Sequence, residues 1–162
     1  MSNIVVSCDK LDVSENAAVT KVSLVRFNKE EIETIKDIAI WPDSSKGTIN
    51  LLSIIERYSF ENPIEETGIS EATAAAEIYS FVCKKKSVIW GDFYDPLVLK
   101  AILKRNNFPF PTCPYSYREY RTTMLLHKEL NLKEFLRLSC TDRAIKISED
   151  VISLYKERKI LL

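Results

Sequence analysis

The first forty residues carry the apolar patterns of three successive strands. Residues 3–8 are a short β-branched run, typical of a buried strand. Residues 17–27 and 31–41 then alternate between two sets of positions, which is the period of a strand. Because only residues 28–30 separate these two segments, we expect three sequential strands in an antiparallel meander.

After the loop at residues 42–47 the pattern changes to that of helices. Apolar spacing predicts one helix over residues 49–59 and another over 70–84, with Ser70 as its N-cap. The apolar residues 87–90 predict a central strand. Three further helices are expected over residues 95–105, 117–130 and 141–159. This order predicts a single α/β or α+β domain, residues 1–162, with a mixed central sheet flanked by helices.

Composition narrows the range of functions. The chain has 162 residues, 46% of them hydrophobic, which is enough for a real core. Only three glycines occur, so a glycine-rich phosphate-binding loop is excluded. The 23 basic residues equal the 23 acidic ones, which argues against a strongly basic nucleic-acid surface. A metal-dependent nuclease stays open, because it needs only a local acidic cluster.

Cysteine spacing and the absence of long apolar runs point to an intracellular protein. The four cysteines, Cys8, Cys83, Cys113 and Cys140, form no C-x-x-C pair, and the one histidine is His127. We therefore expect free thiols and no zinc site. No signal-peptide pattern is visible, and no apolar run approaches the ~20 residues that span a bilayer. These features predict a cytoplasmic protein without a membrane partner.

Two acidic segments are candidates for metal binding. Asp9 and Asp12 follow the first strand, where a sheet would hold a carboxylate rigidly; the alternative is a solvated turn. Asp92 and Asp95 follow the central strand, where open α/β sheets place their ligands. The alternative for Asp95 is a plain helix N-cap.

Two further segments carry charged residues at predicted helix starts. Arg118 and Arg121 are spaced i,i+3, so both would share a helix face and could hold phosphate or a carboxylate partner; the alternative is an ion pair with Glu119 or a neighbour. Residues 141–144 open the last helix, and Glu149 and Asp150 follow two turns later. Here the simpler interpretation is an N-cap at Thr141 or Asp142.

The order of these segments resembles the DEDDh 3′–5′ exonucleases of the RNase H-like superfamily, in particular the phage and prophage branch similar to exonuclease VIII. The resemblance covers essentially the whole chain. It rests on residues 3–10 and 15–19, on Trp90-Gly91 and Tyr94-Asp95, on Arg118-Glu119-Tyr120-Arg121-Thr122, and on residues 142–148. It implies an RNase H-like fold whose sheet begins with the three-strand meander.

Members of this family use four carboxylates to hold two Mg²⁺ or Mn²⁺ ions and a histidine to activate water. In the frame of the resemblance, Asp9 and Asp95 remain as metal ligands, and Asp142 stands in place of the histidine. Ser7 and Ile147 replace the other two carboxylates. A rebuilt site would need Asp150, one turn beyond Ile147, or Glu119 or Asp92. His127 lies in a different predicted helix and does not replace the base.

The leading hypothesis is therefore a degenerate exonuclease in which two-metal catalysis is lost or weak. Its old cleft, shaped by Trp90, Arg118 and Arg121, would bind a single-stranded DNA or RNA end or a protein partner. Zero net charge slightly favours the protein partner. The alternatives are an active Mg²⁺- or Mn²⁺-dependent 3′–5′ exonuclease with relocated ligands, and a phage-type interaction module. The sequence does not define the oligomeric state.

Overall fold

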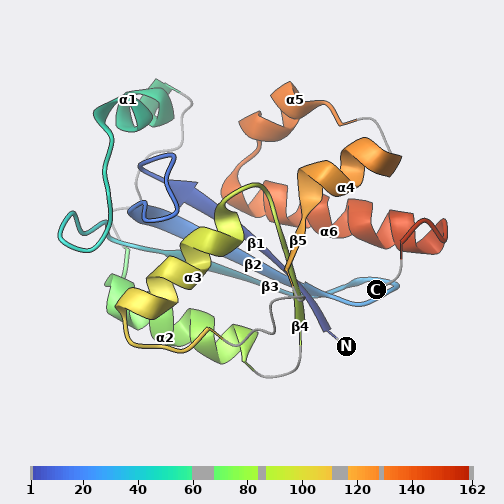
Figure 1. The fold of residues 1–162 in the computed structure, drawn as a ribbon, viewed down its shortest axis with the longest axis horizontal. Helices are drawn as coiled ribbons and strands as arrows, with labels where there is room; N and C mark the ends of the chain where they lie inside the picture. The colour runs from blue at the N-terminus through green and yellow to red at the C-terminus, as the bar shows by residue number, and fades with distance from the viewer. Residues whose placement is uncertain (1, 60–67, 84–86, 111–116, 128–129, 161–162) are drawn as a thin grey trace.

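The computed structural model describes residues 2–59, 68–83, 87–110, 117–127 and 130–160. Its strands form one mixed sheet in the order β3-β2-β1-β4-β5 (Figure 1). These strands are β1 (Ser2–Lys10), β2 (Val19–Phe27), β3 (Ile32–Ala39), β4 (Ser87–Gly91) and β5 (Tyr117–Glu119). The first three form the expected antiparallel meander, and β4 and β5 continue the sheet in parallel with β1. The predicted α/β fold, a mixed central sheet flanked by helices, is confirmed.

Helices cover both faces of this sheet, as Figure 1 shows. They are α1 (Leu51–Ser59), α2 (Glu71–Val82), α3 (Asp95–Arg105), α4 (Tyr120–His127), α5 (Leu132–Arg137) and α6 (Cys140–Lys156). One core lies between the sheet and α2 and α3; the other lies between the sheet and α4, α5 and α6. None of the helices in the described ranges is long and apolar enough to cross a membrane.

The central strand β1 directs alternate side chains to the two cores, because successive residues of a strand point to opposite faces. Ile4, Val6 and Cys8 belong to the core under α2 and α3, whereas Val5 belongs to the core under α6. This alternation continues into the polar end of the strand. It sends Ser7 and Asp9 toward α6, and Cys8 and Lys10 toward α3.

The region after residue 110 differs most from expectation. The predicted helix over 117–130 is wrong at its start, because Tyr117, Arg118 and Glu119 pair with β4 as strand β5. Arg118 and Arg121 therefore do not share a helix face. The short helix α5 was not predicted at all. Both elements are too short to carry a clear period, and contacts with the rest of the fold determine them.

Helix caps were predicted with mixed success. Ser70 is the N-cap of α2, and its Oγ accepts a hydrogen bond from the Thr73 amide at 3.2 Å. The N-cap prediction for Asp95 is wrong: Tyr94 precedes the helix, and the Asp95 carboxylate reaches β1 instead. At α6 the cap is neither Thr141 nor Asp142 but Ser139, whose Oγ accepts from the Asp142 amide at 3.1 Å.

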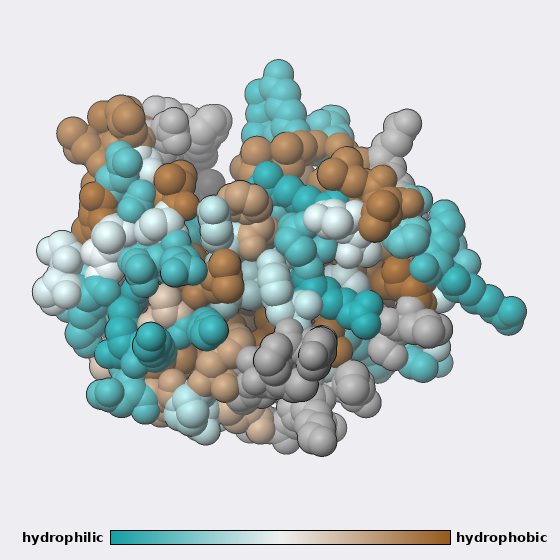
Figure 2. Space-filling view, viewed as in Figure 1, coloured by the Kyte–Doolittle hydropathy of each residue, from teal (hydrophilic) through white to brown (hydrophobic). Residues whose placement is uncertain are grey.

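The surface carries two groups of exposed apolar side chains, visible as brown areas over α1 and over α4 and α5 in Figure 2. The exposed residues are Leu51, Leu52 and Ile55 on α1, Leu125 and Leu126 on α4, and Leu132 and Leu136 on α5.

The described cysteines are free thiols, as predicted: Cys8 and Cys140 are buried, and Cys83 is partly buried. Cys113 lies outside the described residues.

Candidate functional site

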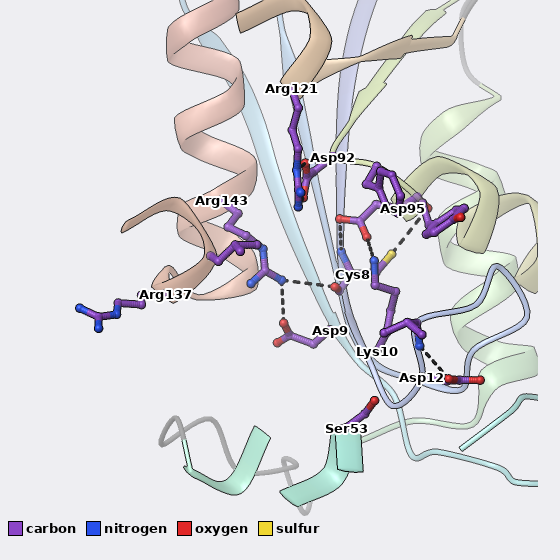
Figure 3. Close-up of a pocket in the computed structure, with 14 residues that line it drawn as sticks. Cys8, Asp9, Lys10, Asp12, Ser53, Asp92, Asp95, Arg121, Arg137 and Arg143 are labelled. Atoms are coloured by element: carbon purple, nitrogen blue, oxygen red, sulfur yellow. Dashed lines mark hydrogen bonds and ion pairs between the residues drawn. The ribbon is translucent and has the colours of Figure 1, made fainter. Parts of the chain in front are cut away.

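A cleft of about 610 Å³ opens at the carboxyl end of β1, next to the start of α3 (Figure 3). Residues from six parts of the chain line it: the end of β1 and the turn after it, α1, the segment from the end of β4 to the first residue of α3, α4, α5, and the first turn of α6. The lining residues are Cys8, Asp9, Lys10, Asp12, Val13, Ser53, Asp92, Phe93, Tyr94, Asp95, Arg121, Leu136, Arg137 and Arg143. The cleft therefore lies where the sequence predicts a ligand site.

Asp95 lies on the floor of this cleft and is held by β1. Its side chain is only 3% exposed, and it forms a salt bridge with the ammonium group of Lys10. Its other carboxylate oxygen accepts a hydrogen bond from the Cys8 amide at 3.2 Å. Burial works to lower the pKa of Lys10, but the Asp95 carboxylate outweighs this effect and raises that pKa above its ordinary value. Lys10 is therefore a cation fixed beside Asp95.

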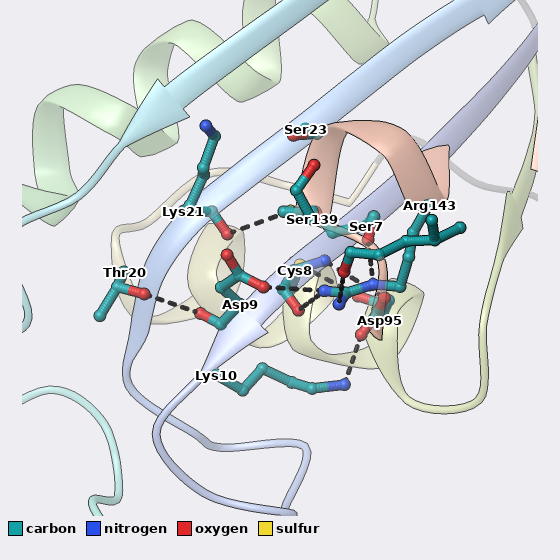
Figure 4. A network of polar contacts seen from close by, with 12 residues as sticks. Ser7, Cys8, Asp9, Lys10, Thr20, Lys21, Ser23, Asp95, Ser139 and Arg143 are labelled. Atoms are coloured by element: carbon teal, nitrogen blue, oxygen red, sulfur yellow. Dashed lines mark hydrogen bonds and ion pairs between the residues drawn. The ribbon is translucent and has the colours of Figure 1, made fainter. Parts of the chain in front are cut away.

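Arg143, from the first turn of α6, occupies the space beside Asp9 (Figure 4). Its guanidinium donates to Asp9 Oδ1 at 2.8 Å, to the Cys8 carbonyl at 3.3 Å and to Ser7 Oγ at 3.2 Å. A further hydrogen bond of 3.0 Å goes to the Leu138 carbonyl. The guanidinium thus fills the space between Ser7 and Asp9, the two β1 positions where the resemblance predicts metal ligands.

A third ion pair closes one side of the cleft. Arg121 on α4 binds both carboxylate oxygens of Asp92, with 2.7 Å between Nη2 and Oδ2. Bidentate pairs of this kind fix both side chains in one plane. The predicted contribution of Arg121 to the cleft is therefore present, and its partner is Asp92 rather than Glu119.

The donor set of the cleft does not fit two divalent metal ions. Such ions need several carboxylates to balance their charge. Here Asp9, Asp92 and Asp95 are each paired with a cation of the same chain. Across the described ranges, no three His, Cys, Asp or Glu side chains form a group that could hold a metal. The charge that a metal would supply is supplied by Lys10 and Arg143.

Ser7 and Ile147, the two positions at which the resemblance implies missing carboxylates, have structural roles. Ser7 is 1% exposed and accepts the hydrogen bond from Arg143. Ile147 is fully buried in the core beneath α6, packed with residues of β1, β2 and β4. An aspartate at 147 would place a charge in this apolar core, which costs several kcal/mol, of the order of 5, without a partner.

Other predicted site residues lie apart from the cleft. Asp142 is exposed and binds the hydroxyl of its cap, Ser139, at 2.6 Å. Asp150 accepts hydrogen bonds from the Tyr120 hydroxyl at 2.6 Å and from Lys146 at 2.8 Å, and it does not line the cleft. His127 lies at the end of α4, a helix separate from α6, as predicted.

Three further predicted site residues, Trp90, Arg118 and Glu119, lie on the paired strands β4 and β5. Trp90 is buried, donates to Asn3 Oδ1 at 3.2 Å and has the Arg118 guanidinium 5.5 Å from its ring centre. Glu119 accepts hydrogen bonds from the amides of Phe93, Arg121 and Thr122. Trp90, Arg118 and Glu119 are not among the residues that line the cleft, and a role of Trp90 and Arg118 in shaping it stays a prediction.

Lys10 and Arg143 are the functional residues that sequence reasoning missed. A signal was present, since each follows an aspartate of a quoted motif, Asp9-Lys10 and Asp142-Arg143. A basic residue next to a degenerate metal ligand is a candidate replacement for the lost positive charge. The spacing alone did not reveal that Arg143, rather than Asp142, faces Asp9.

Comparisons with solved structures agree with this fold. The chain superposes on the product-bound structure of exonuclease I with a TM-score of 0.61 and 14% identity, over 77% of this chain and 31% of that one. E. coli exonuclease I in complex with a dT13 oligonucleotide gives a TM-score of 0.62 and 13% identity, over 77% of this chain and 28% of that one. A complex of SSB and exonuclease I with an inhibitor gives a TM-score of 0.62 and 15% identity, over 76% of this chain and 29% of that one.

These structures define the class of fold, that of the exonuclease domain. The chain covers about a third of the length of these exonucleases or less. No protein-family model matches the sequence, and no curated protein is similar to it in sequence. The comparisons therefore show the fold, while the activity of this chain has to be argued from its own cleft.

Proposed function

We propose that this protein binds the end of a single nucleic-acid strand in its cleft without a metal ion and does not hydrolyse it. One observation carries the proposal: three of the four carboxylates that line the cleft, Asp9, Asp92 and Asp95, are each paired with a lysine or arginine of the same chain. Two-metal hydrolysis needs those carboxylates free to bind cations. The exonuclease fold supplies the argument for nucleic acid as the ligand.

The competing proposal, an active exonuclease with relocated ligands, has less support. Its candidate ligands are Asp92, Glu119 and Asp150, and all three already have partners. Arg121 holds Asp92, Tyr120 and Lys146 hold Asp150, and three backbone amides donate to Glu119. Metal binding would have to break a salt bridge at Asp92 and at Asp150. Descent from the phage exonuclease VIII-like branch stays a prediction from the motif order.

The proposal is tested with fluorescently labelled single-stranded DNA and RNA of equal length. We expect fluorescence anisotropy to give the same dissociation constant in EDTA and in MnCl₂, and a denaturing gel to show intact oligonucleotide after prolonged incubation with Mn²⁺. Asp95→Asn serves as the matched variant. Digestion that requires Mn²⁺ and disappears in Asp95→Asn would overturn the proposal.

A protein partner is the second candidate, and exposed leucines favour it. Leu125 and Leu126 on α4 are 75% and 73% exposed, and Leu51 and Leu52 on α1 are 70% and 68% exposed. Contiguous exposed apolar surface is often an interaction site. This candidate predicts no oligonucleotide binding even at low salt. It also predicts a stable complex in cell lysate that the variant Leu125→Ser/Leu126→Ser no longer forms.

A further inference from the structure

Two aromatic side chains lie at the mouth of the cleft without a role in the core. Phe93 is 51% exposed and Tyr94 is 36% exposed, and both line the cleft. Their ring centres are 4.1 Å apart, with an angle of 69° between the ring planes. The two rings therefore form an apolar corner that is open to solvent, next to the paired charges of the cleft.

The backbone holds Phe93 in this place despite an unfavourable conformation. Its φ of 46° lies in the left-handed region, which bulky residues rarely adopt. The Phe93 amide donates to Glu119 Oε1 at 3.1 Å, and its carbonyl accepts from the Tyr117 hydroxyl at 3.0 Å. Strained residues that their surroundings hold in place occur preferentially at binding sites.

A fixed cation lies against the same ring. The Arg121 guanidinium is 5.6 Å from the centre of the Phe93 ring, and its bidentate pair with Asp92 holds it there. Proteins that bind single strands combine exposed aromatic rings, which stack on bases, with arginine planes and a groove for the backbone. An unpaired nucleobase is the planar ligand that fits this arrangement.

We propose that Phe93 and Tyr94 form a stacking subsite for an unpaired base at the end of a single strand. This inference rests on the proposed function and specifies its source of affinity. Three of the four cations that line the cleft, Lys10, Arg121 and Arg143, are already paired with aspartates, so their phosphate contacts release few counterions; Arg137 is the fourth. Stacking therefore supplies most of the binding free energy. Binding of this kind tolerates any base and depends only weakly on salt.

The experiment uses Phe93→Gly, because glycine adopts a φ of 46° without strain and the fold is kept while the ring is removed. We expect this variant to bind a labelled oligo(dT) in EDTA about 5- to 150-fold more weakly than the wild type, the range that corresponds to loss of one base stack. Trp41→Ala is the matched control. Trp41 is also exposed, at 56%, but lines a different pocket, so its loss leaves affinity unchanged.

A second ligand separates stacking from general weakening. Oligonucleotides that carry an abasic residue at the 3′ or the 5′ terminus are compared with the intact strand. We expect the wild type to bind one of the two abasic strands about as weakly as Phe93→Gly binds the intact one, and Phe93→Gly to show no preference. Wild-type binding that is equal for all strands and unchanged in Phe93→Gly would overturn the stacking subsite alone. A wild type that binds no strand at any salt concentration would overturn the proposed function with it.

Discussion

Single residues at the end of β1 determine which ion pairs form in the cleft. Because strand residues alternate between faces, Asp9 meets Arg143 on one side and Lys10 meets Asp95 on the other. Two neighbouring residues of one strand thus take part in two separate ion pairs. Removal of one partner from either pair would leave a partly buried charge without compensation. At fully buried sites such a loss lowers the free energy of unfolding by about 3–5 kcal/mol, which is the upper limit here.

Glu119 shows how one residue positions the mouth of the cleft, and it predicts a pH dependence. Burial alone would raise its pKa, but hydrogen bonds from the amides of Thr122, Phe93 and Arg121 outweigh this and lower the pKa below 4.5. The depressed pKa means that the stabilisation is complete above about pH 4.5 and is lost as the pH falls through the lower pKa of the folded protein.

We therefore expect Glu119→Gln to lower the free energy of unfolding by about 1–2 kcal/mol at pH 7, because a neutral amide accepts these hydrogen bonds less strongly. The difference between variant and wild type should shrink as the pH falls below 4.5. Urea unfolding at a series of pH values measures both effects. The control is Glu134→Gln, at an exposed carboxylate on α5. A difference that is independent of pH would contradict this role for Glu119.

At the scale of elements, one buried ion pair joins two helices to the turn between β1 and β2. Glu71, at the start of α2, accepts from Arg105 Nε and Asn106 Nδ2 at 2.7 Å each. The Arg105 guanidinium also donates to the Ala17 carbonyl at 3.3 Å. This turn leads from the cleft to β2, so the ion pair supports the cleft from a distance.

Removal of Glu71 should be costly, because it leaves the partly buried Arg105 without a counter-charge. We expect Glu71→Ala to lower the free energy of unfolding by about 3–5 kcal/mol. The more accessible pair of Glu77 and Lys36, with an N–O distance of 2.9 Å, provides the matched control. Glu77→Ala should cost no more than about 1 kcal/mol. Equal losses in the two variants, measured by chemical denaturation, would contradict the assignment of a structural role to Glu71.

The elements that the sequence predicted are those whose period is long enough to read. The strands β1, β2, β3 and β4 and the helices α1, α2, α3 and α6 follow their apolar patterns. Strand β5 has three residues and α5 has six, so neither shows a period of its own. The site was predictable only in part: the motif order placed Asp9 and Asp95 together, but the direction of Arg143 depends on how α6 packs against β1.

At the scale of the whole molecule, the charge balance of the chain is repeated inside its cleft. The chain has 23 basic and 23 acidic residues, and the cleft floor pairs Asp9, Asp92 and Asp95 with Arg143, Arg121 and Lys10. A metal-dependent exonuclease instead needs an excess of negative charge at this position. The fold is similar to that of the exonuclease domain, while the charges on the floor of the cleft balance each other.

Calorimetric titration of Mn²⁺ into the metal-free protein tests this account most directly. Because Lys10 and Arg143 already neutralise Asp95 and Asp9, we expect no saturable heat of binding up to millimolar Mn²⁺, and a thermal unfolding midpoint that is the same in EDTA and in Mn²⁺. Saturable binding of two Mn²⁺ ions per chain, lost in Asp95→Asn, would contradict the central claim.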